Sequence, residues 1–492
     1  MKTKMFLREL KKVFYIFLIP LFFIFHSYLE SFPAIAFPEV LQVLAVHTLS
    51  AFAFFIILFF IIKSARKTAI SFFFISVLFY LFGPLHDVLK DLLPDSLFIR
   101  YSFMLPALLA LLICCIIFFK RTDFKFYRTT KYLNILFCLL LLIDCVQIGI
   151  KIFKEENRKK DFSNIHVQSG TNKPDIYLII ADEYAGATEL KQLYRFDNSK
   201  FEDALKALGF YFIQNTNSNY NYTLYSMASM LSMNYLDSID EVYKKKDIAS
   251  CFSRINHNYF LSYLQKQGYE IENLSIFPLN DVPSVSENIF PFMGTNLITH
   301  QTFFSRLSRD LGYHLVTSLK IKYFAEKAKK HHYKELRNNM VITNQLLQVV
   351  QKNTIAPKFA YVHLEMPHEP YYFDKNGNEY TVYTKNTIEL RTRYIQYLQY
   401  SNSKYLQLLN AILKRAKRNT IVLFMSDHGS RLFTEPVETK YQFSTINAIY
   451  LPDKNYRQFY NGISNVNVLR ALLNSVFNEK LSFLQDKSFY LK

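Results

Sequence analysis

The fold is decided at residues 421–429, which read Ile-Val-Leu-Phe-Met-Ser-Asp-His-Gly. Five consecutive apolar residues without polar alternation are typical of a strand that is buried on both faces of a parallel sheet. Asp427 and His428 follow where this strand ends, at the edge where open α/β sheets place their sites. Because a carboxylate and an imidazole can bind a divalent cation together, this stretch predicts both a sheet and a metal site.

A second strand of the same design covers residues 175–180, and Asp182 and Glu183 follow it. The alternation of further patterns predicts a three-layer α/β sandwich with a mostly parallel sheet. Strands are expected at 269–271, 358–364 and 446–451, helices at 201–208, 223–236, 260–267, 387–417 and 466–477, and a basic helical region at 307–350. If the first and the 421–425 strands are parallel, Asp182, Asp427 and His428 lie on one sheet edge.

The first 150 residues differ from the rest in being strongly apolar. Hydrophobic residues make up 50% of the 492-residue chain, and five stretches are long enough, or nearly so, to cross a bilayer. They cover residues 13–29, 40–62, 69–85, 102–119 and 132–150. The third, with Gly83 and Pro84 near its end, is the weakest and is re-entrant in an alternative with four spans. We expect a five-helix α-helical membrane domain at 1–151, a linker at 152–172 and an extracytoplasmic catalytic domain at 173–492.

Basic residues set the expected orientation. They cluster before the first stretch, after the second and after the fourth, which predicts a cytoplasmic amino terminus. Five crossings then place the domain after residue 150 outside, in a multi-pass protein of the inner or plasma membrane. The formal net charge of +18 suits a surface facing anionic headgroups. Nucleic acid is not expected as a partner, because an outward-facing domain rarely meets it.

Thr223 and His368 are the candidate catalytic residues. Thr223 opens a predicted helix after a polar loop, where free backbone N–H groups favour an arriving phosphate or sulfate. A threonine hydroxyl is a poor nucleophile unless a metal or a base activates it, and the alternative is that Thr223 caps the helix. His368 lies between Pro367 and Pro370 and is either a general acid or a turn residue.

Other residues near these motifs have two readings each. His363, inside a predicted strand, either packs behind the site or contacts substrate, and Arg431 either clamps an anion or points to solvent. Ser226 and Ser229 are alternative nucleophiles if the helix register is shifted by one turn. Glu183 adds a second acid beside Asp182.

Four motifs resemble, in this order, those of the sulfatase branch of the alkaline phosphatase superfamily. They are Ala-Asp-Glu-Tyr at Asp182, Tyr-Thr-Leu-Tyr-Ser-Met-Ala-Ser-Met-Leu-Ser at Thr223, Pro-His-Glu-Pro-Tyr at His368, and Ser-Asp-His-Gly at 426–429. With five amino-terminal spans the chain is similar to the membrane-bound lipoteichoic acid synthases and phosphoethanolamine transferases. The resemblance covers nearly the full chain and implies an alkaline phosphatase/sulfatase-like fold.

The resemblance also implies roles for the residues. One divalent metal ion, zinc or manganese, is expected on Asp182, Thr223, Asp427 and His428, with Thr223 also forming a covalent phosphothreonine. His368 is expected to bind substrate or donate a proton, and His363, Arg431 and Glu183 to bind substrate. Position 182 is Asp where the transferases have Glu, and Glu183 beside it resembles the paired acids of true sulfatases.

Sulfatases proper require a different residue at the nucleophile position. They convert the Cys or Ser of a Cys/Ser-x-Pro/Ala-x-Arg sequence to formylglycine, whereas this chain has Thr223-Leu-Tyr-Ser-Met. Threonine cannot give that aldehyde, and the Pro and Arg are missing. We therefore do not expect sulfate-ester hydrolysis by the formylglycine route.

Taken together, the resemblance implies a membrane-anchored phosphotransferase. It would move a phosphoethanolamine or phosphoglycerol headgroup from a phospholipid donor to an envelope glycan or a lipid-linked acceptor. One alternative is a sulfatase-like hydrolase of phosphodiesters or sulfuric esters, in which water is the acceptor. Another is an inactive envelope scaffold that keeps the fold but works by interaction.

Overall fold

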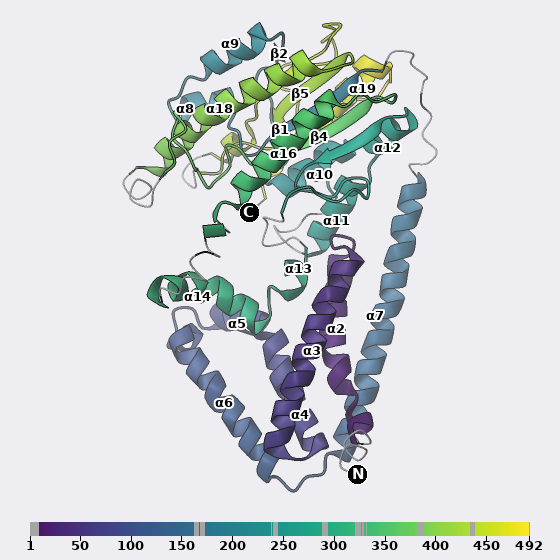
Figure 1. Cartoon of the computed structure of the whole chain (residues 1–492), viewed down its shortest axis with the longest axis vertical. Coiled ribbons are helices and arrows are strands. Elements are labelled where there is room, and N and C mark those ends of the chain that lie inside the picture. Colours follow the sequence, from purple (N-terminus) through teal and green to yellow (C-terminus); the bar gives the residue numbers. More distant parts are fainter. Residues whose placement is uncertain are drawn as a thin grey trace. The chain divides into compact units, whose positions relative to one another are not determined.

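A computed structural model describes residues 9–161, 167, 173–237, 239, 245–287, 294–319, 326, 329–330, 332–380, 388–432 and 438–491. The chain divides into two compact units (Figure 1). A helical unit contains Met1–Glu156 and Phe290–Ala328, and a sheet unit contains Asn157–Ile289 and Lys329–Lys492. The domain boundaries predicted from sequence, at 151 and 173, stay a prediction, because contacts between residues do not locate a membrane.

Four helices among the described residues are long and apolar enough to cross a membrane. The candidate spans are Lys11–Ser31, Phe37–Ile62, Tyr101–Arg121 and Tyr127–Arg158, which contain η1 (Lys11–Val13), α2 (Tyr15–Ser31), α3 (Phe37–Ile62), α6 (Tyr101–Arg121) and most of α7 (Tyr127–Asp161). A short turn, η2 (Leu97–Ile99), precedes α6.

The third predicted span is broken. Its residues form α4 (Ala65–Tyr80) and α5 (Phe82–Leu92), which are bent by 61° at Leu81. Pro84 lacks a backbone N–H and would clash with the carbonyl of residue 80 in a continuous helix, but it fits the first turn of a new one. The count is therefore four spans, or five if the bent pair is one span, as expected for the weakest stretch.

The sheet unit is built on six strands in the order β2-β6-β5-β1-β4-β3. The strands are β1 (Asp175–Ala181), β2 (Tyr211–Phe212), β3 (Glu270–Leu274), β4 (Lys358–Leu364), β5 (Thr420–Ser426) and β6 (Asn447–Tyr450). The four strands β5, β1, β4 and β3 are parallel. At one side, β6 pairs antiparallel with β5, and β2 pairs antiparallel with β6. Every residue of the central strands β1, β4 and β5 is buried, which is why they read as continuous apolar runs. The predicted α/β sandwich is confirmed.

Helices pack on both faces of this sheet (Figure 1). Tyr177 and Ile179 of β1 belong to a core that includes residues of α9 (Ser199–Ala207), α16 (Lys334–Gln351) and α18 (Leu390–Arg415). On the other face, α10 (Thr223–Ser232) contacts α11 (Lys245–Asn256), α12 (Tyr259–Lys266) and α19 (Asn465–Phe477). Shorter elements are α8 (Ala187–Gln192) and η4 (Thr439–Phe443). Because the helices cover the two faces of the sheet, the polar groups described below lie at the amino-terminal and carboxyl-terminal ends of its strands.

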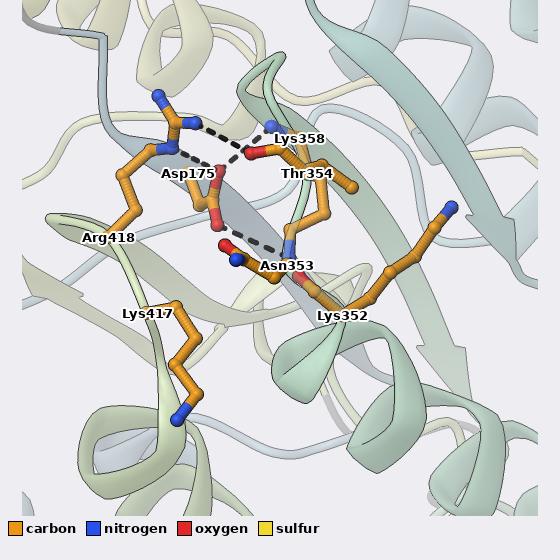
Figure 2. A pocket seen from close by; sticks show the side chains of 7 residues that line it. All are labelled: Asp175, Lys352, Asn353, Thr354, Lys358, Lys417 and Arg418. Carbon is orange, nitrogen blue, oxygen red and sulfur yellow. Dashed lines mark hydrogen bonds and ion pairs between the residues drawn. The ribbon is translucent and has the colours of Figure 1, made fainter.

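At the amino-terminal edge, Asp175 ties three strands together (Figure 2). Its carboxylate accepts a hydrogen bond from the Lys358 backbone N–H at 2.9 Å and lies 3.5 Å from Lys358 Nζ and 3.7 Å from Arg418 Nε. Lys358 is buried and also donates to the carbonyl oxygens of Val349 and Lys352. A small cavity of about 130 Å³ opens here beside Lys352 and Lys417. Because the Asp175 carboxylate pairs with both buried Lys358 and Arg418 and so links three strands, we assign this edge a structural role.

Candidate metal centre

The predicted metal ligands gather at the carboxyl edge of the two central strands. β1 and β5 are parallel neighbours with Ala181 opposite Ser426, so Asp182 and Asp427 leave the sheet side by side. Ligand atoms of Asp182, Asp427 and His428 all lie within 4.8 Å of one another, and the three side chains are buried. Two carboxylates and one imidazole at this spacing form a set that can hold a divalent cation.

Thr223 lies directly against this cluster. Its hydroxyl Oγ1 is 3.3 Å from Asp182 Oδ1 and 3.1 Å from His428 Nε2. Thr223 is the first residue of α10, whereas Tyr222 is the N-cap residue, so the alternative role of Thr223 as helix cap is not what the structure shows. A single hydroxyl is thus placed among the three ligand side chains at a helix amino terminus.

Unused hydrogen-bonding atoms show that the ligand set fits a cation. Asp427 Oδ1 accepts bonds from the backbone N–H groups of Glu183 and His428, but among the described residues its buried Oδ2 accepts none. His428 Nδ1 lies 2.7 Å from the Gly429 carbonyl oxygen, which can only accept, so the proton of the neutral ring is on Nδ1. The Nε2 lone pair therefore faces the cluster, as a metal ligand requires.

Burial and neighbouring charges prepare the ligands differently. Burial, and next the charge of Asp182, raises the pKa of the Asp427 carboxyl to about 7. Burial, and next Arg431, lowers the pKa of His428 to about 4, so this imidazole is neutral at pH 7. For Asp182 burial acts in the opposite direction, but His368, His363 and His428 hold its pKa below the usual range. Near neutral pH a cation therefore competes with a proton on Asp427.

His363 is placed behind Asp182. Its Nε2 lies 3.4 Å from Asp182 Oδ2 and its Nδ1 lies 2.9 Å from the Tyr361 hydroxyl. The ring is fully buried, which favours the packing alternative over direct contact with a substrate. A histidine in this position orients the carboxylate that it faces.

His368, Glu183 and Arg431 form the more open side of the site. His368 Nε2 is 3.5 Å from Glu183 Oε2, and Glu183 Oε1 accepts a hydrogen bond of 2.8 Å from the Arg431 backbone N–H. The Arg431 guanidinium lies 4.4 Å from the centre of the Tyr222 ring. Burial lowers the pKa of His368, but Asp182 and Glu183 outweigh it and raise the pKa above the usual value. With 27% of its side chain exposed, His368 can meet a substrate while holding a proton.

The alternative nucleophiles are engaged elsewhere. Ser226 Oγ donates to the Asp427 carbonyl oxygen at 2.6 Å and Ser229 Oγ donates to the Asn234 carbonyl oxygen at 2.8 Å. Neither hydroxyl contacts the ligand side chains. The helix is therefore not shifted by one turn, and Thr223 is the hydroxyl residue of α10 that contacts Asp182 and His428.

Several residues that hold the site were not found by sequence reasoning. Glu189 is fully buried and its Oε2 accepts from the Ser430 backbone N–H at 3.2 Å. Asn465 donates to the carbonyl oxygens of Ser426 and Asp427. Asn221, two residues before Thr223, exchanges hydrogen bonds with the Leu491 backbone. These side chains bind backbone groups brought close only by folding, so no local pattern marks them.

Comparison with known proteins shows that one protein-family model matches the chain. Residues 174–470 match the model of the sulfatase family, and no curated protein matches the chain. Similar solved structures include the periplasmic domain of EptC from Escherichia coli, at 14% identity and a TM-score of 0.40, covering 64% of this chain and 85% of that one. Lipooligosaccharide phosphoethanolamine transferase A from Neisseria meningitidis matches at 15% and 0.39, covering 94% and 95%. The phosphonate monoester hydrolase of Agrobacterium radiobacter matches at 11% and 0.38, covering 65% and 80%.

Proposed function

Since the chain belongs to the sulfatase family, we propose that it is a membrane-anchored phosphotransferase of that family, acting through a phosphothreonine at Thr223. Its donor would be a phospholipid with a phosphoethanolamine or phosphoglycerol headgroup. Its acceptor would be a hydroxyl of an envelope glycan or of a lipid-linked saccharide. The candidate spans give the enzyme its membrane anchor.

One observation supports this proposal most strongly. The hydroxyl that lies 3.1 Å from His428 Nε2 and 3.3 Å from Asp182 belongs to a threonine. A threonine in this position can accept a phosphoryl group but cannot become the aldehyde that sulfate-ester cleavage uses. Phosphoryl transfer is therefore favoured over sulfatase chemistry.

Asp182, Asp427 and His428, with Thr223 as fourth ligand, would hold one divalent cation, either zinc or manganese. Such a cation, when bound, lowers the effective pKa of a neighbouring hydroxyl and neutralises charge on phosphate oxygens. His363 keeps Asp182 oriented toward the cluster at 3.4 Å. Arg431, on the open side, can pair with a non-reacting phosphate oxygen.

In the first step, Thr223 Oγ1, having lost its proton to solvent, attacks the phosphorus of the donor. The new Oγ1–P bond forms as the bond from phosphorus to the diacylglycerol oxygen breaks, in line with the attack. His368 donates its proton to that leaving oxygen. The products are diacylglycerol and a threonine that carries the phospho-headgroup.

In the second step, an acceptor hydroxyl attacks the same phosphorus. His368, now neutral, takes the proton of that hydroxyl, and the Oγ1–P bond breaks. The headgroup is then attached to the acceptor, Thr223 Oγ1 regains from solvent the proton that it lost, and both Thr223 and His368 return to their starting states. Water in place of the acceptor would give the hydrolase alternative with the same residues.

The test is release of diacylglycerol by the full chain reconstituted in vesicles of phosphatidylethanolamine or phosphatidylglycerol with zinc or manganese. We expect release from one of the two lipids, a loss of several orders of magnitude in Thr223→Ala, and no loss in Thr188→Ala, an exposed threonine outside the site. Equal release by Thr223→Ala would refute the proposal. Release that does not depend on any glycan acceptor and yields free phospho-headgroup would favour the hydrolase.

A further inference from the structure

The segment Phe290–Ala328 belongs to the helical unit although it lies within the predicted exported domain of the sequence. Its described part contains α13 (Asn296–Thr299) and α14 (Phe303–Leu319), which contact α2 and the pair α4 and α5, respectively. The Gly83 backbone N–H donates to the Gln301 carbonyl oxygen at 2.9 Å. A Cβ atom at position 83 would lie 2.8 Å from the Gln301 carbonyl oxygen, which is backbone, so this approach favours glycine. The described part of this segment therefore packs against helices of the membrane domain.

Arg306 links α14 to α5 through an ion pair with Asp87. It is 5% exposed, and its two terminal nitrogens donate to Asp87 of α5 at 2.6 and 3.1 Å. Asp310, one turn later, lies 3.7 Å from Arg306 Nε and accepts a hydrogen bond of 2.5 Å from the Tyr101 hydroxyl of α6. Arg306 itself is buried, whereas the Asp87 side chain is 44% exposed, so loss of both acidic partners would leave a buried guanidinium without counter-charge. We call Arg306, Asp87, Asp310 and Tyr101 the Arg306 cluster.

The joined helices expose a large apolar surface. Phe304 of α14 is 67% exposed and Leu92 of α5 is 70% exposed, and the Phe304 ring also meets Phe79 of α4 at 5.5 Å between ring centres. Other exposed apolar side chains of this surface are Leu85, Val88, Leu89 and Leu93. Water-facing surfaces of monomeric proteins rarely group so many large apolar side chains. Because α4 and α5 together form the bent pair that could be one membrane span, we expect lipid to cover this apolar surface.

We propose that α5 and the first turns of α14 form one platform that lies in the membrane interface, held together by the Arg306 cluster. Its partner is the boundary between lipid headgroups and acyl chains. At about 1.5 Å per residue the 11 residues of α5 are too short to cross a bilayer. Lys90 in the last turn of α5 and Arg309 of α14 can reach headgroups. The inference goes beyond the proposed function and does not depend on it.

The chain contains no tryptophan, which makes the test direct. Phe304→Trp and Leu92→Trp each give the full chain a single indole fluorophore. The variants are reconstituted in vesicles with lipids brominated either close to the headgroup or deep in the acyl chain. Leu49→Trp, on an exposed position near the middle of α3, is the matched control for a deep site.

We expect the headgroup-proximal bromine to quench Phe304→Trp and Leu92→Trp more strongly than the deep bromine, and the reverse for Leu49→Trp. The platform is refuted if neither lipid quenches Phe304→Trp and Leu92→Trp. It is also refuted if the deep bromine quenches these two variants more strongly than the headgroup-proximal bromine, as expected for Leu49→Trp. Adding Arg306→Gln should abolish most quenching of Phe304→Trp but leave that of Leu92→Trp. Arg306→Lys, which keeps the positive charge beside Asp87 and Asp310, should retain most of the quenching. If Arg306→Gln leaves the quenching of Phe304→Trp unchanged, Arg306 does not hold α14 against α5, and if Arg306→Gln does not fold, loss of the quenching in Arg306→Lys overturns the same step.

Discussion

At the scale of single residues, the site depends on an unequal pair of carboxylates. His368 and next His363 lower the pKa of Asp182, whereas burial and Asp182 itself raise the pKa of Asp427 to about 7. His428 is already neutral, because its pKa is lowered to about 4. A cation therefore competes mainly with the proton on Asp427, and this competition can be measured.

We predict that zinc binding to the metal-free protein releases protons near neutral pH. Below pH 7 Asp427 is protonated, so affinity falls as pH decreases, and above pH 7 it levels off because the carboxylate is free. Calorimetric titration in two buffers of different ionisation enthalpy measures the released protons. An affinity that is the same on both sides of pH 7, with no proton release, would contradict this account of Asp427.

We further predict that His363→Gln weakens zinc binding by about 10- to 100-fold, because Asp182 loses the ring that orients it. His257→Gln is the matched control, since this histidine lies near Asp281, away from the cluster. The measurement is zinc affinity by competition with a chelating dye. If His363→Gln and His257→Gln bind zinc equally well, His363 has no orienting role.

The candidate ligand residues could be found from the sequence because each follows a strand or opens a helix within a short apolar or polar pattern. Asp182, Thr223, Asp427 and His428 are of this kind, and the structure brings all four together. Glu189 and Asn465 could not be predicted in this way. Their partners are backbone groups of Ser430, Ser426 and Asp427, which are distant in sequence and adjacent only in the folded chain.

At the scale of elements, strand β4 matches its prediction at both ends, and its residues 358–364 are buried throughout. The predicted helix at 223–236 ends earlier, at Ser232, because Met233 adopts a left-handed conformation with φ of 51°. The 69–85 span is interrupted at Leu81. Composition predicts apolar length well, but it does not show where a backbone turns.

The amino-terminal edge of the sheet allows a test of stability that is separate from chemistry. We predict that Asp175→Asn lowers the free energy of unfolding by about 3 kcal/mol, because buried Lys358 loses its counter-charge. Asp203→Asn is the control, since its pair with Lys206 is exposed and contributes less than about 1 kcal/mol. Denaturant titration measures both. Equal stability of the two variants would show that the Asp175 network is not structural.

At the scale of the whole molecule, the number of membrane crossings decides on which side the chemistry takes place. The loop charges and five crossings predict that residue 123 is cytoplasmic and residue 355 is outside. The bent pair α4 and α5 makes this count the critical point, since four crossings would return the sheet unit to the side of the amino terminus. Sequence patterns also could not show that 290–328 joins the helical unit, because its contacts are with residues some 200 positions away.

We predict that a membrane-impermeant maleimide labels Ile355→Cys in intact cells but labels Asp123→Cys only after the membrane is permeabilised. Both positions are exposed, so accessibility within the protein is matched. The unsubstituted chain is the background control, because its own cysteines lie in candidate spans or, for Cys251, are buried. The reverse pattern, in which Asp123→Cys is labelled in intact cells and Ile355→Cys only after permeabilisation, would mean four crossings and the loss of an extracytoplasmic site.

The most direct test of the central claim, that Thr223 carries the transferred group, is the intact mass of the full chain. The protein is incubated with phosphatidylethanolamine or phosphatidylglycerol and zinc, without acceptor, and compared with Thr223→Ala. The account predicts an increase in mass equal to one phospho-headgroup, absent in Thr223→Ala and assigned to Thr223 by fragmentation. An adduct that persists in Thr223→Ala, or metal-loaded protein that releases diacylglycerol without any adduct on Thr223, even when rapidly quenched, would contradict it.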